Sequence, residues 1–348
     1  MIGKSGTAKL HIARACALTI AVGIGTLGVR QAQAADAMPG KGITVQPAQQ
    51  TEVLSMFQVD IVNDGLEKLG YTVQPAKTLT VALYYTAIAQ GDADFGVQAW
   101  WPGHKFAYQH AGGEAKMTLL GDIVPHAAQG YFVDKKTADQ YHINDIAQFK
   151  DPKIAALFAT EPGGKAGLIG CEPGWACEKI IDYQIKAYGL ENTVEQVSGT
   201  ASILFASVVS KYRNGNHIFY YGFTPNWVSS VLIPGRDVTS LAVPFTALPP
   251  DTANGSPNTI APDGRNVGWM VNDLKAVANN DFIAKNPPVK RWLERVSIPI
   301  ADVNKEAFII QNGEKSPEQI ATRAGEWIAA HQVEFDGWLK EAADGASK

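Results

Sequence analysis

The chain has 348 residues and a formal net charge of −4, with 30 Lys and Arg against 34 Asp and Glu. This mild acidity excludes the basic surface that binding to nucleic acid requires. A chain of this length is too long for one small hydrophobic core, so it predicts two lobes.

The first 34 residues have the pattern of a cleaved secretory signal peptide. Met1–Arg14 is basic and lacks acids, Ala15–Val29 is apolar, and Ala32-Gln33-Ala34 is a small-x-small cleavage site. The apolar run is too short to cross a membrane, and no later run is long enough. Cleavage after Ala34 leaves 26 Lys and Arg against 34 acids, a net charge of −8. We therefore expect an exported, periplasmic protein.

After residue 40, short β-rich runs alternate with amphipathic runs. We predict strands over Gly42–Gln46, Tyr71–Val73, Leu79–Ala82, Asp94–Gln98, Gln129–Asp134, Thr193–Val197 and His217–Tyr221. We predict helices over Val53–Leu69, Tyr84–Gln90, Glu178–Tyr188 and Ala201–Tyr212. This alternation is typical of an α/β protein.

A helix near the C-terminus has the clearest start signal in the chain. Ser316 is a good N-cap, Pro317 occupies the first helical position, and Gln319 completes a capping box. The apolar residues that follow recur at helical spacing and include Trp327 and Trp338. We expect both indoles to belong to the hydrophobic core and not to a binding site.

Cys171 and Cys177 are the two cysteines that remain after signal cleavage. In an oxidising compartment such a pair usually forms a disulfide, which here would fix the shape of the loop between them. The alternatives are a redox pair or half of a metal site. The chain has neither a C-x-x-C motif nor a second cysteine pair to support them.

Sequence motifs of catalysis are missing. There is no G-x-S-x-G, no H-E-x-x-H and no Walker loop, since Gly163–Gly167 lacks the Lys-Ser/Thr ending. His104 and His110 are too far apart to share a helical face at i, i+4 spacing. We therefore expect neither an enzyme nor a bound cofactor.

Aromatic residues occur in three polar, turn-rich segments, two of them directly after predicted strands. The segments are Ala99–His104, Pro173–Cys177 and Tyr220–Trp227. Each alone is compatible with the edge of a core, but three together favour a ligand site, since α/β proteins bind ligands at strand ends.

These aromatic segments suit a quaternary ammonium ion. Such an ion carries a positive charge and no N–H donor, so aromatic faces can hold it by cation–π attraction, with Trp the strongest partner. A ligand that also bears a carboxylate needs hydrogen-bond donors. His104 and the backbone N–H groups of the cysteine loop could supply them.

At these residues the chain resembles the glycine betaine/proline betaine-binding (ProX) proteins of ProU-type ABC importers. The similar runs are Pro39–Val45, Leu66–Val73, Ala127–Tyr141, Gly170–Glu178 and Phe335–Trp338. The resemblance implies a type II periplasmic-binding-protein fold, in which two lobes, each a mixed sheet flanked by helices, enclose the ligand. We expect lobe 1 to hold residues 42–127 and 246–348, and lobe 2 to hold residues 128–245.

The resemblance also assigns the site. Two of the three family tryptophans fall on Trp100 and Trp175, while the third falls on Phe223. The histidine that meets the carboxylate falls on His104. The backbone N–H groups that also bind this carboxylate fall on Ala176 and Cys177, and the family disulfide joins Cys171 and Cys177.

This sequence departs from the family pattern in three places. Phe223 weakens the cation–π attraction but keeps an aromatic wall, and Trp101 or Trp227 could compensate. Ala176 replaces a glycine, which would matter only in a left-handed backbone conformation. In Thr160–Gly167 the family has an Asp-rich calcium site, but Glu161 alone cannot supply the oxygen ligands, so we expect no metal.

The predicted function is therefore the substrate-binding component of an ABC importer for glycine betaine or a related betaine. We expect a monomer that delivers its ligand to a membrane permease. Three other functions stay open. The first is binding of choline or another cation, which predicts an acidic residue in the cage and no use for His104. The others are a secreted hydrolase that uses His104, and a chemoreceptor or scaffold partner.

Overall fold

The structure is a computed structural model that describes residues 38–250, 258–261 and 263–345. The predicted signal peptide, residues 1–34, lies outside these residues. Within the described part of the chain, no helix has the length and apolar character needed to cross a membrane.

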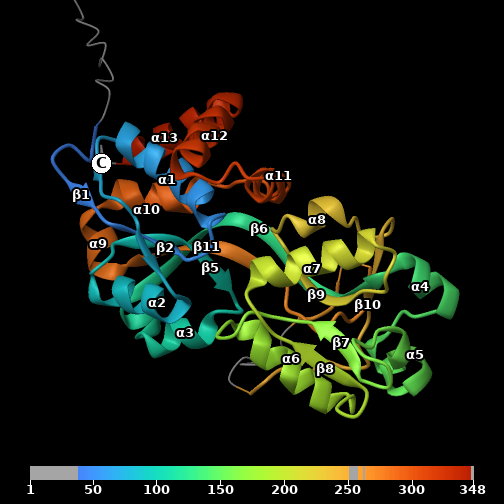
Figure 1. The fold of residues 1–348 in the computed structure, drawn as a ribbon. Helices are drawn as coiled ribbons and strands as arrows, with labels where there is room; N and C mark the ends of the chain where they lie inside the picture. The colour runs from blue at the N-terminus through green and yellow to red at the C-terminus, as the bar shows by residue number, and fades with distance from the viewer. Residues whose placement is uncertain (1–37, 251–257, 262, 346–348) are drawn as a thin grey trace, which may run out of the picture. The chain divides into compact units, whose positions relative to one another are not determined.

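Strands and helices alternate along most of the chain, as Figure 1 shows. The strands are β1 (Thr44–Val45), β2 (Pro47–Gln50), β3 (Thr72–Val73), β4 (Lys77–Leu79), β5 (Phe95–Trp101), β6 (Met117–Asp134), β7 (Ala166–Ile169), β8 (Val194–Val197), β9 (Phe219–Thr224), β10 (Val238–Leu241) and β11 (Asn272–Asn279). The helices are α1 (Ser55–Lys68), α2 (Val81–Gln90), α3 (Lys105–His110), α4 (Lys135–Tyr141), α5 (Pro152–Leu157), α6 (Ala176–Ala187), α7 (Ala201–Arg213), α8 (Val228–Val231), α9 (Asn280–Lys285), α10 (Pro287–Arg295), α11 (Ile300–Gln311), α12 (Pro317–Ala330) and α13 (Gln332–Asp344). Two 3-10 turns, η1 (Gly113–Ala115) and η2 (Ile146–Lys150), complete the described elements.

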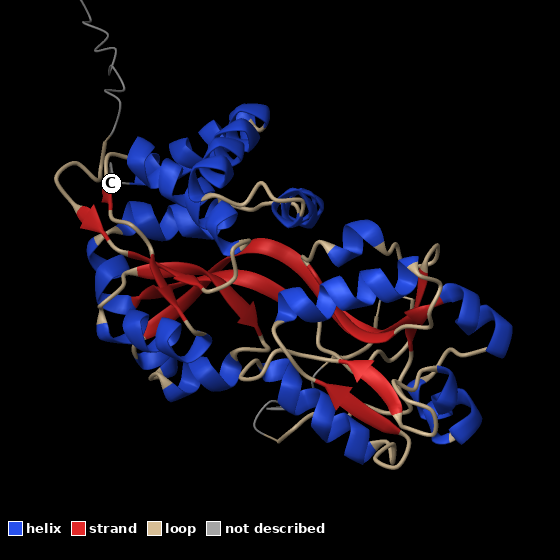
Figure 2. Cartoon of the chain, viewed as in Figure 1, coloured by secondary structure: helices blue, strands red, loops and turns tan. Residues whose placement is uncertain are grey.

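The central sheet is mixed, and the long strand β6 lies inside it and connects its two halves. In the described residues the strand order is β4-β2-β5-β11-β6-β9-β7-β8, and β10 also pairs with β6. The first part of β6 pairs with β11, up to Ala127, and the second part pairs with β9 from Ala128 onward. The α/β prediction is therefore confirmed, with helices on both faces of the strands (Figure 2).

Helix α1 shows how the apolar pattern builds the layers. Its buried face includes Phe57, Ile61, Val62 and Leu66, which recur at helical spacing. The helix ends at Lys68 with Leu69 as its C-cap, and the next residue, Gly70, has a φ of 92°, a conformation that favours glycine. Helices α1, α10, α12 and α13 contribute to one hydrophobic cluster, and α2 and α3 to another.

The hydrophobic core consists of separate clusters. One contains buried side chains of the strands β6 to β10 and the helices between them, from Tyr131 to Met270. Another contains side chains from Val45 to Ala127 together with side chains from Leu274 to Ala342. Trp100 and Trp227 pack against both of these clusters.

The C-terminal prediction is confirmed in its start and its core. The Ser316 hydroxyl accepts from the Gln319 backbone N–H at 3.3 Å, and the Gln319 side chain completes the capping box. Trp327 is 8% exposed, and Trp338 packs against the same cluster. The single predicted stripe is divided at His331 into α12 and α13.

Several predicted boundaries were wrong. Leu79–Ala82 was expected to be a strand, but α2 already begins at Val81 after the N-cap Thr80. The aromatic pair Trp100-Trp101 was placed after a strand, yet it forms the last two residues of β5. Phe223 likewise lies inside β9. For β5 and β9, pairing with a neighbouring strand extends the strand beyond the predicted apolar run.

Candidate functional site

Three aromatic side chains from different parts of the chain meet at one place. Trp100 is near the end of β5, Phe223 is near the end of β9, and Trp175 is the N-cap residue of α6. The ring centroids of Trp100 and Phe223 are 5.7 Å apart, and those of Trp175 and Phe223 are 6.0 Å apart. The structure therefore brings together the three aromatic residues that the sequence assigned to the cage.

The ring of Phe223 is steeply inclined to the rings of both tryptophans, like the floor of a box to its walls. The planes of Trp100 and Phe223 are inclined by 84°, and those of Trp175 and Phe223 by 65°. Phe223 is 9% exposed, whereas both tryptophans are partly exposed. Phe223 thus forms a buried floor between two indoles that keep accessible surface, which suits cation–π contact with a small ammonium ion.

Neither Trp101 nor Trp227 has a described ring contact with these three residues. The Trp101 ring packs at 5.4 Å from the ring of Tyr108, because successive residues of β5 point to opposite faces of the sheet. Trp227 is the N-cap residue of α8 and packs between two core clusters. These contacts therefore give no support to the prediction that Trp101 or Trp227 replaces the missing third tryptophan.

His104 lies one turn after Trp100. Its backbone N–H donates to the Trp100 carbonyl at 2.7 Å, and the neighbouring Gly103 N–H donates to the Asn272 side chain at 2.8 Å. His104 is also the N-cap residue of α3. These bonds fix the backbone of His104 relative to the backbone of Trp100.

The imidazole of His104 is neutral at physiological pH. Desolvation by the surrounding protein lowers the pKa of His104 to about 4, although part of the residue stays accessible. Its Nδ1 lies 3.2 Å from the Tyr85 hydroxyl. Burial raises the pKa of Tyr85, so this hydroxyl keeps its proton and can donate a hydrogen bond to Nδ1. In that tautomer Nε2 carries the hydrogen and is a donor.

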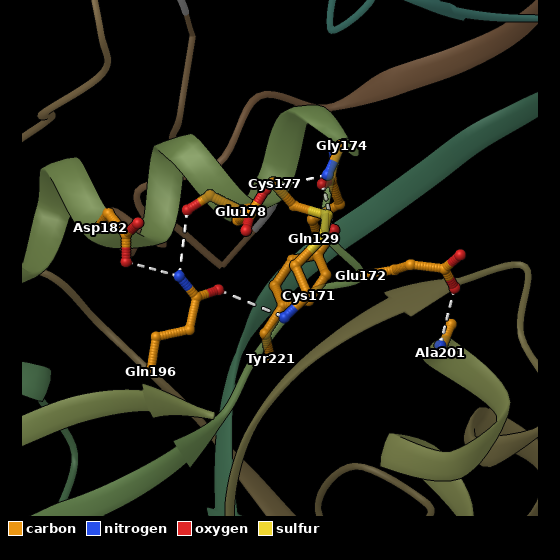
Figure 3. Close-up of a disulfide and its surroundings, with 10 residues drawn as sticks. All are labelled: Gln129, Cys171, Glu172, Gly174, Cys177, Glu178, Asp182, Gln196, Ala201 and Tyr221. Atoms are coloured by element: carbon orange, nitrogen blue, oxygen red, sulfur yellow. Dashed lines mark hydrogen bonds between the residues drawn. A yellow bond between two sulfur atoms is a disulfide. The ribbon is translucent and has the colours of Figure 1, made fainter. Parts of the chain in front are cut away.

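The loop before α6 is fixed by a disulfide and by side-chain hydrogen bonds, shown in Figure 3. Cys171 and Cys177 are bonded, with their Cα atoms 5.9 Å apart. The Gln196 side chain accepts from the Cys171 N–H at 3.3 Å and donates to Asp182 at 2.6 Å. The loop therefore has a defined conformation that holds Trp175 at the start of α6.

The first turn of α6 presents free backbone donors. Trp175 makes no side-chain capping bond, and no described group accepts from the N–H of Ala176 or of Cys177. Unpaired N–H groups at a helix N-terminus attract anions. Ala176 is exposed and Cys177 is buried. Both predicted carboxylate contacts are thus available as donors.

The exchange of glycine for alanine at position 176 does not disturb the loop. Among described non-glycine residues, a positive φ occurs at His126 and His142 and not at Ala176. The left-handed position of this loop is Gly174, with φ of 89°. Its N–H donates to the Glu178 carboxylate at 2.9 Å.

An acidic residue near the cage escaped the sequence analysis. Glu52 lines a small pocket together with Trp100, Pro225 and Gln58. Burial, and to a lesser degree the negative charge of Glu172, raise the pKa of Glu52 to about 7. Nothing local marks Glu52 as a site residue, because the contact depends on the packing of the loop after β2.

The described residues contain no group of three or more His, Cys, Asp and Glu side chains that could hold a metal ion. The segment Thr160–Gly167, for which the sequence predicted no metal, leads into β7, which begins at Ala166. Glu161 in this segment is exposed.

The chain belongs to the family of substrate-binding domains of ABC-type glycine betaine transport systems, whose model matches residues 43–330. It is 46% identical to the glycine betaine-binding periplasmic protein OusX of Dickeya dadantii, over 89% of this chain and 92% of that protein. It is also 46% identical to the glycine betaine/proline betaine-binding periplasmic protein of Escherichia coli, over 92% of this chain and 96% of that protein.

Solved structures share the fold at lower identity. Lactococcal OpuAC, in a closed conformation complexed with glycine betaine, has a TM-score of 0.62 at 20% identity and covers 86% of this chain and 100% of its own. An ABC-transporter choline-binding protein in complex with choline has a TM-score of 0.65 at 17% identity, with coverage of 86% and 96%. The expected type II periplasmic-binding-protein fold is therefore confirmed.

Proposed function

We propose that this chain is the periplasmic substrate-binding component of an ABC importer for glycine betaine or a closely related betaine. The contact of Trp100, Trp175 and Phe223 is the observation that carries the proposal, and His104 and the first turn of α6 supply hydrogen-bond donors. The family and its relatives are transport proteins and not enzymes, which argues against a hydrolase that uses His104.

The two ends of a betaine require different partners, and the site offers both. The trimethylammonium group lies against the faces of Trp100 and Trp175 above Phe223. The carboxylate accepts from Nε2 of His104 and from the N–H groups of Ala176 and Cys177. Hydrogen bonds to an ionised acceptor are stronger than neutral ones, so a neutral histidine suffices.

Ligand binding in this proposal closes two lobes around the site. One lobe contains residues 42–127, and the other begins at residue 128, where β6 changes its pairing from β11 to β9. The second crossing in this proposal lies at the start of β11 and not between residues 245 and 246, because Ala247, Leu248 and Met270 pack with the cluster formed by β6 to β10. A ligand that contacts both lobes favours the closed form, which a monomer then presents to a membrane permease.

The proposal is tested by calorimetric titration of residues 35–348 with glycine betaine. We expect saturable binding with one ligand per chain. Heats no larger than those of dilution, up to millimolar ligand, would contradict the assignment. Co-purification with the partner permease, in the presence and absence of ligand, tests the transport role against a chemoreceptor or scaffold role.

Glu52 favours a second candidate ligand. Choline has a cationic end and no carboxylate, and its recognition predicts an acid near the aromatic cage, which Glu52 supplies beside Trp100. Parallel titration with choline separates the two ligands. Tighter binding of choline than of glycine betaine would favour this candidate.

A further inference from the structure

A small polar pocket lies beside the cage and shares Trp100 with it. It is lined by Gln50, Glu52, Leu54, Ser55, Gln58, Gln98, Trp100, Pro225 and Leu274. The free space between these side chains is about that of one water molecule or one hydroxyl group. None of the donors assigned to the betaine carboxylate lines this pocket.

Two polar groups that line the pocket have no partner in the described part of the chain. Gln58 is 2% exposed, and its side-chain oxygen accepts from the Gln98 amide at 2.8 Å, but its own amide nitrogen has no described acceptor. The Glu52 carboxylate has neither a described hydrogen bond nor a described ion pair. Glu52 is half-buried, and the Gln58 amide nitrogen is not among the fully buried unpaired atoms of the described residues, so both groups remain accessible to a ligand group that enters the pocket.

The other polar side chains of the pocket are already engaged. The Ser55 hydroxyl donates to the Gln50 carbonyl at 2.9 Å, and the Gln98 side chain accepts from the Gln50 N–H at 3.0 Å. The pocket therefore offers one free amide donor from Gln58 and one free carboxyl group from Glu52.

Charge near the pocket limits what can enter it. The carboxylate of Glu172 acts on Glu52 from the disulfide loop, and it is held in place by the Ala201 N–H at 2.8 Å (Figure 3). A ligand carboxylate in the pocket would meet the Glu52 carboxyl group and would also be repelled by the charge of Glu172, which lies outside the pocket lining. A methylated ammonium group has no hydrogen to donate. A hydroxyl group can accept from Gln58 and donate to Glu52, so it satisfies both.

We propose that Glu52 and Gln58 form a subsite for a hydroxyl group on the ligand, so that the binding protein prefers hydroxylated quaternary-ammonium compounds to their deoxy analogues. The proposal rests on the proposed function only in that the ammonium group occupies the aromatic cage. It deepens that function because it names the substituent that the cage alone cannot recognise.

The test uses ligand pairs that differ by one hydroxyl group. The first pair is 4-hydroxyproline betaine, as both epimers, against proline betaine, and the second is choline against ethyltrimethylammonium. Titration calorimetry of the full mature chain should give about tenfold tighter binding for the hydroxylated member of at least one pair. In Glu52→Ala that ratio should fall to within about twofold, whereas Glu52→Gln, which keeps an acceptor, should retain part of it.

Glu67→Ala is the matched control, because Glu67 is an exposed acid on α1 outside the pocket. It should leave the ratio unchanged, and thermal unfolding checks that each variant is folded. Equal affinity within both pairs, or a ratio that survives in Glu52→Ala, would overturn the proposal. Absence of glycine betaine binding would instead contradict the proposed function, and the choline pair would still test the subsite.

Discussion

The two ends of the site are built in contrasting ways. The aromatic end is formed by rings that contact one another, with Phe223 touching both Trp100 and Trp175. The polar end consists of separate donors, namely the imidazole of His104 and the amides at the start of α6. The first end depends on packing across distant elements, and the second on local hydrogen bonds.

This contrast separates affinity from selectivity. Every quaternary ammonium compound has the group that the aromatic end holds, so that end should contribute affinity for all of them. The polar end distinguishes ligands that carry a carboxylate from those that do not. A variant of the aromatic end should therefore weaken the binding of every quaternary ammonium ligand, whereas a variant of the polar end should weaken mainly the binding of ligands that carry a carboxylate.

The largest expected effect is that of Trp100→Ala. It removes a cation–π wall and the apolar contact with the ligand methyl groups, so we expect affinity for glycine betaine and choline to fall about a hundredfold. Trp101→Ala is the control, because that ring faces Tyr108 on the other side of β5. Calorimetry should show near-normal affinity in the control. Equal losses in both variants would mean that the effect comes from folding and not from the cage.

His104→Ala should have a smaller and more selective effect. We expect about tenfold weaker binding of glycine betaine, the usual size of a lost hydrogen bond to a charged group, and no more than about a twofold change for choline. The measurement is the ratio of the two dissociation constants. If choline weakens as much as glycine betaine, the imidazole does not recognise a carboxylate.

Phe223→Leu tests the floor of the cage. The substitution keeps apolar bulk but removes the aromatic face, so we expect about three- to fivefold weaker binding of all quaternary ammonium ligands. Phe132→Leu is a suitable control, since Phe132 stacks on Tyr220 in the same sheet and has no described ring contact with the cage. An unchanged affinity in Phe223→Leu would remove this residue from the site.

The smallest expected effect concerns pH. The pKa of His104 is lowered to about 4, so the folded protein favours the neutral imidazole. As pH falls from 6.5 toward 4, the unfolded chain takes up a proton at His104 and the folded protein does not, so the free energy of unfolding decreases in this range. Between pH 6 and 8 glycine betaine affinity should change less than about twofold in Glu52→Gln, a background without the Glu52 carboxyl group. Clearly tighter binding at pH 6 would show that His104 binds the carboxylate in its charged form.

Much of the fold follows from local sequence signals. Helix α1 and the start of α12 were predicted because helical spacing and caps act over a few neighbouring residues. Strand β11 was missed, since its Asn-Asp-Leu-Lys start lacks an apolar run and the strand is defined by pairing with β5 and β6. Strand β7 is short, and its pairing with β8 and β9 is equally non-local.

The site divides in the same way. The aromatic residues and His104 could be predicted, because Trp beside Pro and Gly is conspicuous in sequence and the family motif covers these positions. Glu52 and Gln58 could not, because an acid and an amide near the start of a helix usually face solvent. Their place beside Trp100 results from the way the loop after β2 packs against β5.

The most direct test of the two-ended site is a crystal structure of the mature protein with glycine betaine. We predict the ammonium nitrogen between the indoles of Trp100 and Trp175 over the ring of Phe223. The carboxylate should lie within hydrogen-bond distance of His104 Nε2 and the N–H groups of Ala176 and Cys177. A ligand bound in the reverse orientation, or outside these three rings, would contradict the account.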